Sequence, residues 1–305
     1  MTDLKKDVYT RVTDRIISDL ENGVRSWMKP WNAAHPAGSI GKPLRHNGIP
    51  YQGMNIVLLW CEAMHKGYSA PLWMTYKQAQ ELGGQVRGGE TGSLVVYANS
   101  IKRTETNEQG EDFERAIPFL RAYSVFNIEQ IDALPAHYYA PPLDPLPLAE
   151  RIDSAERFMT GTGAAISHGG DRAFYAPGPD RVQLPPFASF RDKESYYAVA
   201  LHELTHWSGH KSRLDRSLNN RFGDTAYARE ELVAELGAAF LCADLGITPE
   251  VRDDHAAYIA SWLTALRGDK RLIFTAAAHA QRAADHLHGL QPQAEGMPAE
   301  SRAAA

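Results

Sequence analysis

A chain of 305 residues is long enough for two domains, and its composition, 44% hydrophobic and 23% charged, is typical of a soluble globular protein. No apolar run approaches the roughly 18 residues that cross a membrane, and the acidic residues near the N-terminus argue against a signal peptide. Cys61 and Cys242 lie in apolar stretches without metal-motif spacing, so we expect free thiols in a reducing, cytoplasmic compartment and no membrane partner.

The net charge of −5 argues weakly against a nucleic-acid partner, but the charge is distributed unevenly. Between residues 22 and 103 there are nine Lys or Arg and only three Glu, so this segment is basic within an acidic chain. Because local charge decides contact with a polyanion, the N-terminal part of the chain is the part expected to bind nucleic acid.

Apolar periodicity and turn residues predict mixed α and β structure in the first half of the chain. The glycines that follow two apolar runs favour the ends of helices. The predicted elements, in chain order, are helices at 3–22 and 54–66, a short helix capped by Thr75, and a hairpin of strands 93–100 and 116–128 around an acidic turn.

Four of the six tryptophans lie in the first 73 residues, among Lys, Arg and Tyr. Exposed rings among cations suit single-stranded nucleic acid, because bases stack on rings at about 1–3 kcal/mol each while cations follow the phosphates. The alternative for Trp27, Trp31 and Trp73 is a place in the hydrophobic core, which we expect for Trp60 within its apolar run. The residues predicted to contact DNA are Trp27, Lys29, Trp31, Arg45, Tyr51, Trp73, Tyr76, Lys77 and Arg87.

Residues 133–147, ALPAHYYAPPLDPLP, contain five prolines and predict a semi-rigid linker. The linker separates an N-terminal domain, 1–132, from a C-terminal domain, 148–290, and the Ala/Pro/Glu-rich end, 291–305, predicts a disordered tail. The elements expected in the C-terminal domain are helices at 148–159, around 201–210, at 225–245, 249–267 and 269–288, with short strands at 164–167 and within 173–184.

The C-terminal domain contains an H-E-x-x-H motif within LHELTHWSGH, on an expected helix capped by Asp192. His202 and His206 lie one helical turn apart on one face, from which both imidazoles reach a single Zn²⁺. Glu203 lies where it can accept a proton from water held at the metal. The alternative is a chance match on a buried helix.

A third ligand is expected from the following helix. A metzincin histidine is excluded, because Ser212 stands at its position and His210 lies about 12 Å from His202 along the helix. Glu231 and Glu235 share one face and resemble the E-x-x-x-D/E pattern of gluzincins, in which the first carboxylate binds zinc and the second holds a ligand histidine. We assign Glu231 as the ligand and Glu235 as its support; the reverse assignment and a solvated glutamate run are the alternatives.

This set predicts metal-assisted hydrolysis of a peptide bond, with Zn²⁺ as the expected cofactor and Mn²⁺ as an alternative. The strand region 173–184 is expected to hold the peptide as an added edge strand. Tyr227, His255 and Tyr258 are the candidates for stabilising the oxyanion.

Long motifs in both halves of the chain resemble one known family. In the first half these are W-x-K-P-W at 27–31, Y-x-G-x-N at 51–55, and W-x-T-x-K-Q-A with L-G-G-x-V-R-x-G-E-x-G within 73–92. Together with LHELTHWSGH at 201–210 and YAREELVAELGAAFLCADLGI at 227–247, they are similar to ArdC-type antirestriction proteins over about residues 7–290. Residues 46–50 look like an insertion relative to the family pattern.

The resemblance implies an α+β fold of two domains, an N-terminal α+β domain that binds single-stranded DNA and a C-terminal zincin-like, gluzincin-type metallopeptidase domain. It also implies a protein of conjugative plasmids that acts in the bacterial cytoplasm of a recipient and protects incoming unmodified DNA from host restriction. The alternatives are a DNA-tethered metalloprotease that cleaves a restriction or other DNA-bound protein, and a primase or conjugation accessory with a structural metal. A nuclease is disfavoured, because the sequence contains no carboxylate cluster typical of two-metal nucleases.

Overall fold

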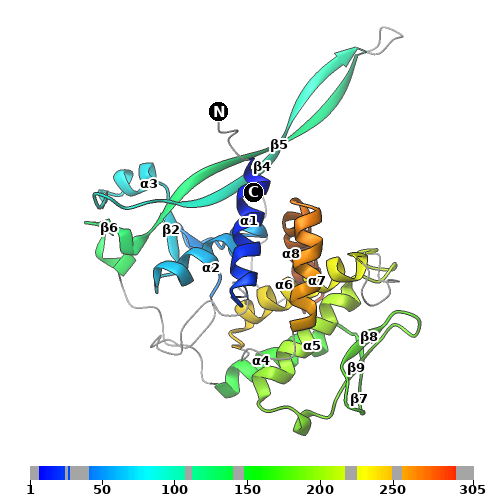
Figure 1. Cartoon of the computed structure of the whole chain (residues 1–305). Helices are drawn as coiled ribbons and strands as arrows, with labels where there is room; N and C mark the ends of the chain where they lie inside the picture. Colours follow the sequence, from blue (N-terminus) through cyan, green and yellow to red (C-terminus); the bar gives the residue numbers. More distant parts are fainter. Residues whose placement is uncertain are drawn as a thin grey trace.

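The structure is a computed structural model that describes residues 7–24, 27, 41–106, 112–139, 148–216, 225–248 and 256–292 (Figure 1). Its N-terminal half alternates helices with strands. In chain order the elements of this half are α1 Val8–Glu21, β1 Leu44–Arg45, α2 Met54–Lys66, β2 Leu72–Met74, α3 Tyr76–Glu81, β3 Gln85–Val86, β4 Ser93–Thr106, β5 Asp112–Asn127 and β6 Ile131–Asp132, with 3₁₀ turns at Ile128–Gln130 and Ala136–Tyr139.

Local side chains explain where the N-terminal helices begin and end. The Asp7 carboxylate accepts a hydrogen bond from the backbone N–H of Thr10 at 2.7 Å and begins α1. Thr75 and Gln78 form a capping box at the start of α3, which confirms the predicted cap. Gly67 ends α2 in a left-handed conformation, with φ of 72°, that glycine adopts without a steric penalty.

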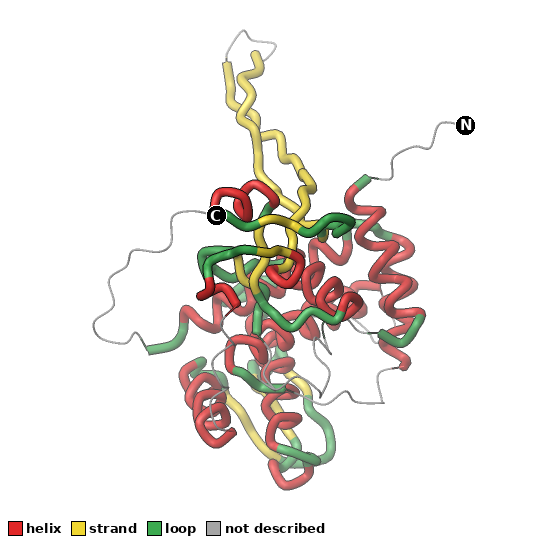
Figure 2. Tube along the Cα trace, turned by 90° about the vertical axis from the view of Figure 1, so that its left-hand side faces the viewer, coloured by secondary structure: helices red, strands yellow, loops and turns green. Residues whose placement is uncertain are grey.

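The main sheet of this half has the strand order β1-β2-β5-β4, with β1 and β2 parallel and the other neighbours antiparallel. β4 and β5 form a hairpin that is paired from Ser93 opposite Val125 to Thr106 opposite Asp112. This hairpin, called the arm below, extends beyond the body of the protein (Figures 1 and 2). The predicted strands were too short, because the outer part of the arm covers no core and so lacks the apolar alternation of a half-buried strand.

The C-terminal half packs helices beside a small sheet. Its sheet has the order β7-β9-β8, so β8 is an edge strand antiparallel to β9. The elements of this half are α4 Leu148–Gly161, β7 Ala165–His168, β8 Phe174–Ala176, β9 Arg181–Leu184, a 3₁₀ turn at Phe187–Ser189, α5 Lys193–Ser208, α6 Thr225–Leu245, α7 Ala256–Gly268 and α8 Leu272–Gly289. The helices and strands predicted for this half are confirmed, with most ends shifted by a few residues. Residues 249–255, the start of the predicted helix 249–267, lie outside the described residues.

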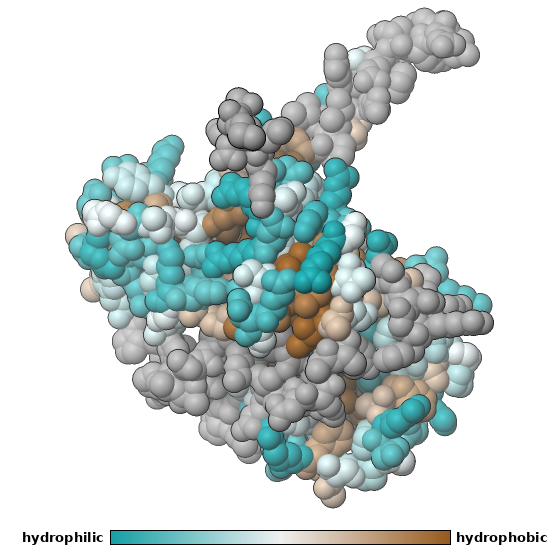
Figure 3. All heavy atoms as spheres, in the orientation of Figure 1, coloured by the Kyte–Doolittle hydropathy of each residue, from teal (hydrophilic) through white to brown (hydrophobic). Residues whose placement is uncertain are grey.

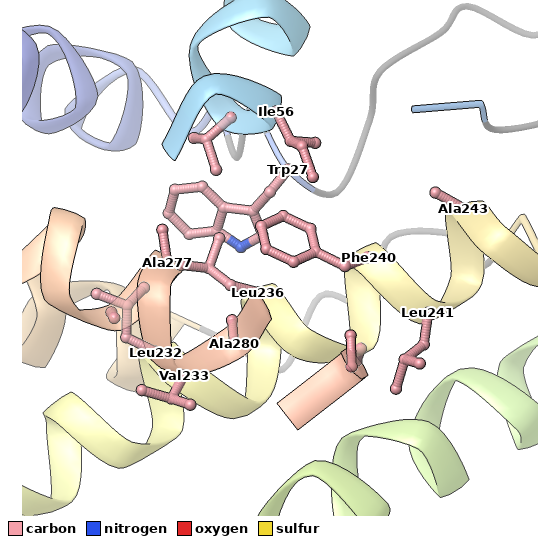
Figure 4. Packing of buried hydrophobic residues seen from close by; sticks show 14 of the residues in the cluster. Trp27, Ile56, Leu232, Val233, Leu236, Phe240, Leu241, Ala243, Ala277 and Ala280 are labelled. Carbon is pink, nitrogen blue, oxygen red and sulfur yellow. The ribbon is translucent and has the colours of Figure 1, made fainter. Parts of the chain in front are cut away.

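One hydrophobic core joins the two halves. Trp27 is 2% exposed and lies beside Ile56 of α2 and Ala277 of α8 (Figure 4). Trp60 of α2 packs against Phe240 of α6, with ring centroids 6.0 Å apart. The two predicted domains are therefore halves packed over a common core, and the linker is not their only connection.

Polar contacts cross the same boundary. Nζ of Lys42 lies 2.7 Å from a carboxylate oxygen of Asp244 in α6, and Nε2 of His288 in α8 lies 2.9 Å from the same oxygen. The Thr13 hydroxyl of α1 donates to the carbonyl of Lys270 at 2.7 Å. These contacts hold α1 and the segment before β1 on the helices of the C-terminal half.

Parts of the predicted linker and tail belong to the folded halves. Tyr138 is buried in a small cluster with Met74, so the first residues of the predicted linker pack on the N-terminal half. The Gln291 side chain donates to the carbonyl of Phe158 at 3.2 Å, so the predicted tail begins within the fold. Residues 140–147 and 293–305, which make up the rest of these two segments, lie outside the described residues.

Among the residues that Figure 3 colours, hydrophilic ones gather over the N-terminal half in the upper left of the view, and hydrophobic atoms show in the middle near α7 and α8. Within the described ranges, no helix has both the length and the apolar character needed to cross a membrane.

Candidate metal centre

The helices that carry the predicted metal ligands approach each other closely. α5 carries the H-E-x-x-H motif and begins at Asp192, whose carboxylate accepts the N–H of Ser195 at 2.6 Å. α6 has Gly237 where the two helices meet, and a Cβ at this position would lie 2.6 Å from Cγ2 of Thr205. The missing side chain therefore lets the glutamates of α6 reach the histidines of α5.

Side chains of His202, His206 and Glu231 converge between the two helices. Nε2 of His206 lies 3.2 Å from Nε2 of His202 and 3.4 Å from a carboxylate oxygen of Glu231, whose other oxygen lies 3.6 Å from Nε2 of His202. One ligand atom from each residue lies within 4.8 Å of the others. Glu235 lies instead 3.8 Å from Nδ1 of His202, on the far side of that ring. The geometry thus favours Glu231 over Glu235 as the third ligand.

The chemistry of these three side chains fits a divalent ion. Burial opposes a proton on the rings, but the carboxylates of Glu230 and Glu231 raise the pKa of His206 to about 10, and Glu231 raises that of His202. Burial would raise the pKa of Glu231, but its contacts with both histidines lower it further than burial raises it. Two imidazoles and a carboxylate are ligands that Zn²⁺ and Mn²⁺ accept, and a metal ion takes the place of the shared proton.

Glu230 is a functional candidate that the sequence reasoning missed. Its carboxylate lies 3.3 Å from Nδ1 of His206, and Arg216 donates to its two oxygens at 2.9 and 3.1 Å. Arg216 also donates to the hydroxyl of Ser208 at 3.0 Å. A carboxylate on the far ring nitrogen fixes the tautomer and orientation of a ligand histidine. The available signal was the Glu230-Glu231 pair, but nothing in the sequence indicates that Arg216, in a loop after α5, would return to it.

Glu203 lies beside the ligands and is 7% exposed. Burial raises the pKa of its carboxyl, which His202 and His206 lower to a smaller extent. A cavity of about 240 Å³ opens onto these residues, and its other walls come from β8 and α6. The wall residues are Ala173, Phe174, Tyr175, Pro177, Tyr227 and Glu230. Of the three oxyanion candidates, Tyr227 thus lines the cavity, and His255 and the side chain of Tyr258 lie outside the described residues.

Arg213 holds the edge strand β8 against the end of α5. Its guanidinium donates to Asp180, in the turn after β8, at 2.9 Å and to the Tyr175 hydroxyl of β8 at 3.3 Å. Its Nε donates to the Trp207 carbonyl at 2.7 Å, and its guanidinium lies 3.7 Å from the centroid of the Trp207 ring. The hydrogen bonds from Arg213 lower the pKa of Asp180 to about 2. The wall of the cavity is therefore fixed to the metal-site helix.

The structure corrects three of the predicted DNA contacts. Trp27, Tyr51 and Trp73 are 2%, 5% and 1% exposed, so their rings offer no open face to a base. For Trp27 and Trp73 this burial agrees with the alternative given in the sequence analysis, a place in the hydrophobic core. Lys29 and Trp31 lie outside the described residues.

Of the other four predicted contacts, Tyr76, Lys77 and Arg87 are exposed and Arg45 is half-buried. Arg45 lies with its guanidinium 5.7 Å from the centroid of the Tyr51 ring. Tyr76 is 43% exposed, and Lys77 lies next to it with a largely exposed side chain. Arg87 pairs with Glu90 at 2.8 Å, which leaves less of its charge available to a phosphate.

Comparisons with known proteins match the two halves separately. The family of the N-terminal domain of the anti-restriction factor ArdC matches residues 6–126, and the family of zincin-like metallopeptidases matches residues 153–279. Protein y4eC of Sinorhizobium fredii is 48% identical over 295 residues, which cover 95% of this chain and 94% of that protein. DNA primase TraC of Escherichia coli is 40% identical over 307 residues, but this match covers 94% of the chain and only 27% of the primase.

Two solved structures are similar to nearly the whole chain. They are the metal-free and Mn(II)-bound forms of the antirestriction protein ArdC from plasmid R388, which are 47% and 45% identical to this chain. Each match covers 93% of this chain and 98% of the solved chain, with TM-scores of 0.77 and 0.76. Similarity at this level over the full length of a relative, together with the two matched domains, means that this chain belongs to the ArdC family of antirestriction proteins, with a zincin-like C-terminal half.

Proposed function

We propose that the C-terminal half hydrolyses a peptide bond with the help of Zn²⁺ or Mn²⁺ held by His202, His206 and Glu231. The observation that carries this proposal is the convergence of the three ligand groups at the wall of a cavity that also contains the buried carboxylate of Glu203. When bound, the ion supplies Lewis-acid polarisation of a peptide carbonyl and of water.

Glu203 is the proposed general base. Its carboxyl has a pKa raised by burial, which suits a group that accepts a proton from water and returns it to the leaving amine. Tyr227 lines the same cavity and is the proposed donor to the oxyanion. Glu230 and Glu235 are proposed to hold the outer ring nitrogens of His206 and His202, so that the inner nitrogens face the metal.

The edge strand β8 is proposed to bind the substrate. Phe174 and Tyr175 of β8 line the cavity, and within the described residues β8 is paired on one side only, with β9. The open side of an edge strand can pair with an extended peptide through main-chain hydrogen bonds. The expected substrate is therefore an extended or locally unfolded segment of a protein.

The N-terminal half is proposed to bind single-stranded DNA. Membership of the ArdC family supports a DNA partner, and the excess of six positive charges between residues 22 and 103 supports contact with a polyanion. Arg45, Tyr76, Lys77 and Arg87 are the predicted contacts that remain available at the surface. With both halves, the chain would protect unmodified DNA of a conjugative plasmid from restriction in the cytoplasm of the recipient.

Three roles compete within this proposal. The chain coats DNA and blocks nucleases, or it cleaves a protein bound to the DNA that it occupies, or it assists priming during conjugation. The third rests on the relative named DNA primase TraC, of which the chain spans 27%. A buried general base beside a complete ligand set favours cleavage over coating alone.

The test is protection of unmodified DNA entering a restricting host, with the wild type compared with Glu203→Gln. Glu203 is not among the ligands, so the variant should keep its metal, and metal content is the control for an intact site. Protection by the wild type alone would support cleavage. Equal protection would show that hydrolysis is not needed for this role, and protection by neither would contradict the antirestriction proposal.

A further inference from the structure

The arm carries large exposed rings that folding does not explain. Its inner end is held by Asn55 of α2, whose side-chain amide donates to the Val96 carbonyl and accepts the Val96 N–H, both at 2.8 Å. Beyond Val96, the described side chains of both strands are exposed or half-exposed, and the arm leaves the body (Figure 2). Leu120, opposite Ala98, still packs against the common core. Rings on the opposite face of this two-stranded ribbon bury little surface and are left open to a ligand.

The strand register gathers aromatic and basic residues on one side of the arm. Residues opposite each other in an antiparallel pair share a face, and every second residue along a strand returns to it. Tyr97 is opposite Arg121, Asn99 is opposite Phe119, and Tyr123 is two residues from Arg121 on the same strand. We call Tyr97, Phe119, Arg121 and Tyr123 the aromatic face.

The other side of the arm differs in character. At the same level of the ribbon it carries the pair Val96 and Ala122 and the pair Ala98 and Leu120. These are small or aliphatic residues without a ring system on which a base could stack. The concentration of rings is therefore a property of one face and is not shared by the whole arm.

The rings of the aromatic face support one another and stay open to solvent. Tyr97 and Tyr123 are 43% and 42% exposed. The ring centroids of Tyr97 and Phe119 are 6.2 Å apart, and the guanidinium of Arg121 lies 5.1 Å from the Phe119 centroid. The Asn99 side-chain amide donates to the Tyr97 hydroxyl. These contacts order the side chains, so a ligand that stacks on them loses less conformational entropy on binding.

Charge on the aromatic face favours an anion. Among the described residues no carboxylate forms an ion pair with Arg121, and no described side chain on its face of the ribbon is acidic. Glu114 is on the other face, where it pairs with Lys102 at 2.8 Å. Toward the body, the guanidinium of Arg45 lies 5.7 Å from the centroid of the Tyr51 ring. Burial raises the pKa of Tyr51, and Tyr123 raises it further. Arg45 therefore extends the positive charge from the aromatic face onto the body.

We infer that the aromatic face is a stacking site for unpaired bases of single-stranded DNA, with Arg121 and Arg45 beside the phosphates. Side chains two residues apart on one face of a strand are separated by about 7 Å. Neighbouring bases in a stacked strand lie about 3.4 Å apart. When a protein ring is inserted between two such bases, their separation becomes about 7 Å, which matches the spacing of the side chains. A duplex hides the faces of its bases within the stack, whereas a single strand presents them.

This inference rests on the proposed binding of single-stranded DNA and assigns that binding to a surface of the arm. The test is the Kd of the full-length protein for a fluorescein-labelled oligothymidylate, measured by fluorescence anisotropy. Tyr97→Ala combined with Tyr123→Ala is expected to weaken binding roughly tenfold or more. The matched control, Tyr97→Phe with Tyr123→Phe, keeps both rings and should bind like the wild type. Leu120→Ala, on the other face, should also leave the Kd unchanged.

The outcomes separate the inference from the proposal beneath it. If the wild type fails to bind, the single-stranded DNA proposal is wrong. If the wild type and the double alanine variant bind equally well, DNA binding stands and the aromatic face is not its site. The assignment would also be overturned if the phenylalanine variant or Leu120→Ala lost as much DNA affinity as the double alanine variant. In that case the rings of the aromatic face would not be the cause of binding.

A second measurement does not depend on the folding of any variant. The wild-type protein is crosslinked by ultraviolet light to an oligonucleotide that contains iododeoxyuridine, and the crosslinked peptides are identified by mass spectrometry. Crosslinks at Tyr97, Phe119 or Tyr123 are expected. Crosslinks confined to residues outside the arm would overturn the inference while supporting DNA binding.

Discussion

Gly237→Ala tests whether the close approach of α5 and α6 builds the metal centre. The added Cβ would lie 2.6 Å from Cγ2 and 2.8 Å from Oγ1 of Thr205. Non-bonded carbon atoms rest at about 3.5–4.0 Å, so the two helices must separate by roughly 1 Å at this point. α6 carries Glu231 and α5 carries both histidines, so the separation acts directly on the ligand set.

Two opposing effects decide the change in stability. Forcing a methyl group into a packed contact costs about 1–3 kcal/mol. Alanine in place of glycine inside a helix stabilises it by about 0.8–1.0 kcal/mol. The free energy of unfolding should therefore fall by at most about 2 kcal/mol. Metal affinity should fall more sharply, by roughly tenfold or more, because ligand distances tolerate shifts of only about 0.2 Å.

Calorimetric titration of the metal-free protein with Zn²⁺ or Mn²⁺, together with thermal unfolding, measures both effects. Thr205→Ala removes the two atoms nearest to the new Cβ and leaves Cβ of residue 205 at 3.3 Å, a contact that a small shift relieves. It also removes the hydrogen bond from the Thr205 hydroxyl to the Leu201 carbonyl. The double variant Gly237→Ala/Thr205→Ala should thus recover metal affinity. Wild-type affinity and a higher melting temperature for Gly237→Ala alone would refute the reasoning.

Three further substitutions test the surroundings of the site and the contact between the halves. Glu230→Gln should weaken metal binding about 10- to 100-fold in a chelator competition assay, because the carboxylate on Nδ1 of His206 is lost; unchanged affinity would contradict this. Arg213→Ala frees the turn after β8 and should raise KM for a peptide substrate without changing metal affinity; an equal loss of metal would show that Arg213 supports the ligands instead. Burial raises the pKa of Asp244, but the contacts with His288 and Lys42 lower it by more. The stabilisation that the charged Asp244 carboxylate gains from these two contacts is therefore present above about pH 4 and is lost as the pH falls through the lowered pKa. Asp244→Asn should therefore reduce the free energy of unfolding in urea by about 1–3 kcal/mol at pH 7 and by much less once the wild-type carboxyl is protonated; an equal reduction at both pH values would refute the ion-pair explanation.

The sequence was most informative where helical spacing alone determines neighbours. His202 and His206 share a face of any helix that contains them, and so do Glu231 and Glu235, so the candidate site followed from two predicted helices. The choice between the two glutamates required the crossing of α5 and α6. That crossing depends on the contact of Gly237 with Thr205, which no local pattern contains.

Aromatic residues of the N-terminal half were harder to interpret, because exposure is a property of tertiary packing. Trp27 and Trp73 stand near loops and cations in the sequence, but the common core buries both. Tyr97 and Tyr123 look like ordinary residues of a hairpin, and their exposure follows from the length of the arm beyond the body. The composition identified the basic segment, but it could not show which aromatic rings are exposed to solvent.

The common core makes the two halves depend on each other for stability. A buried tryptophan covers about 150–250 Å², which at about 25 cal/mol per Å² corresponds to roughly 4–6 kcal/mol. Trp27 and Trp60 both pack against helices of the C-terminal half, so separating the halves would expose two such side chains. A metal ion that binds only the folded protein stabilises that whole core by an amount that grows with the ratio of its free concentration to its Kd. The metal centre therefore stabilises the base of the arm even without any direct contact between them, and DNA binding and hydrolysis are best measured on the intact chain.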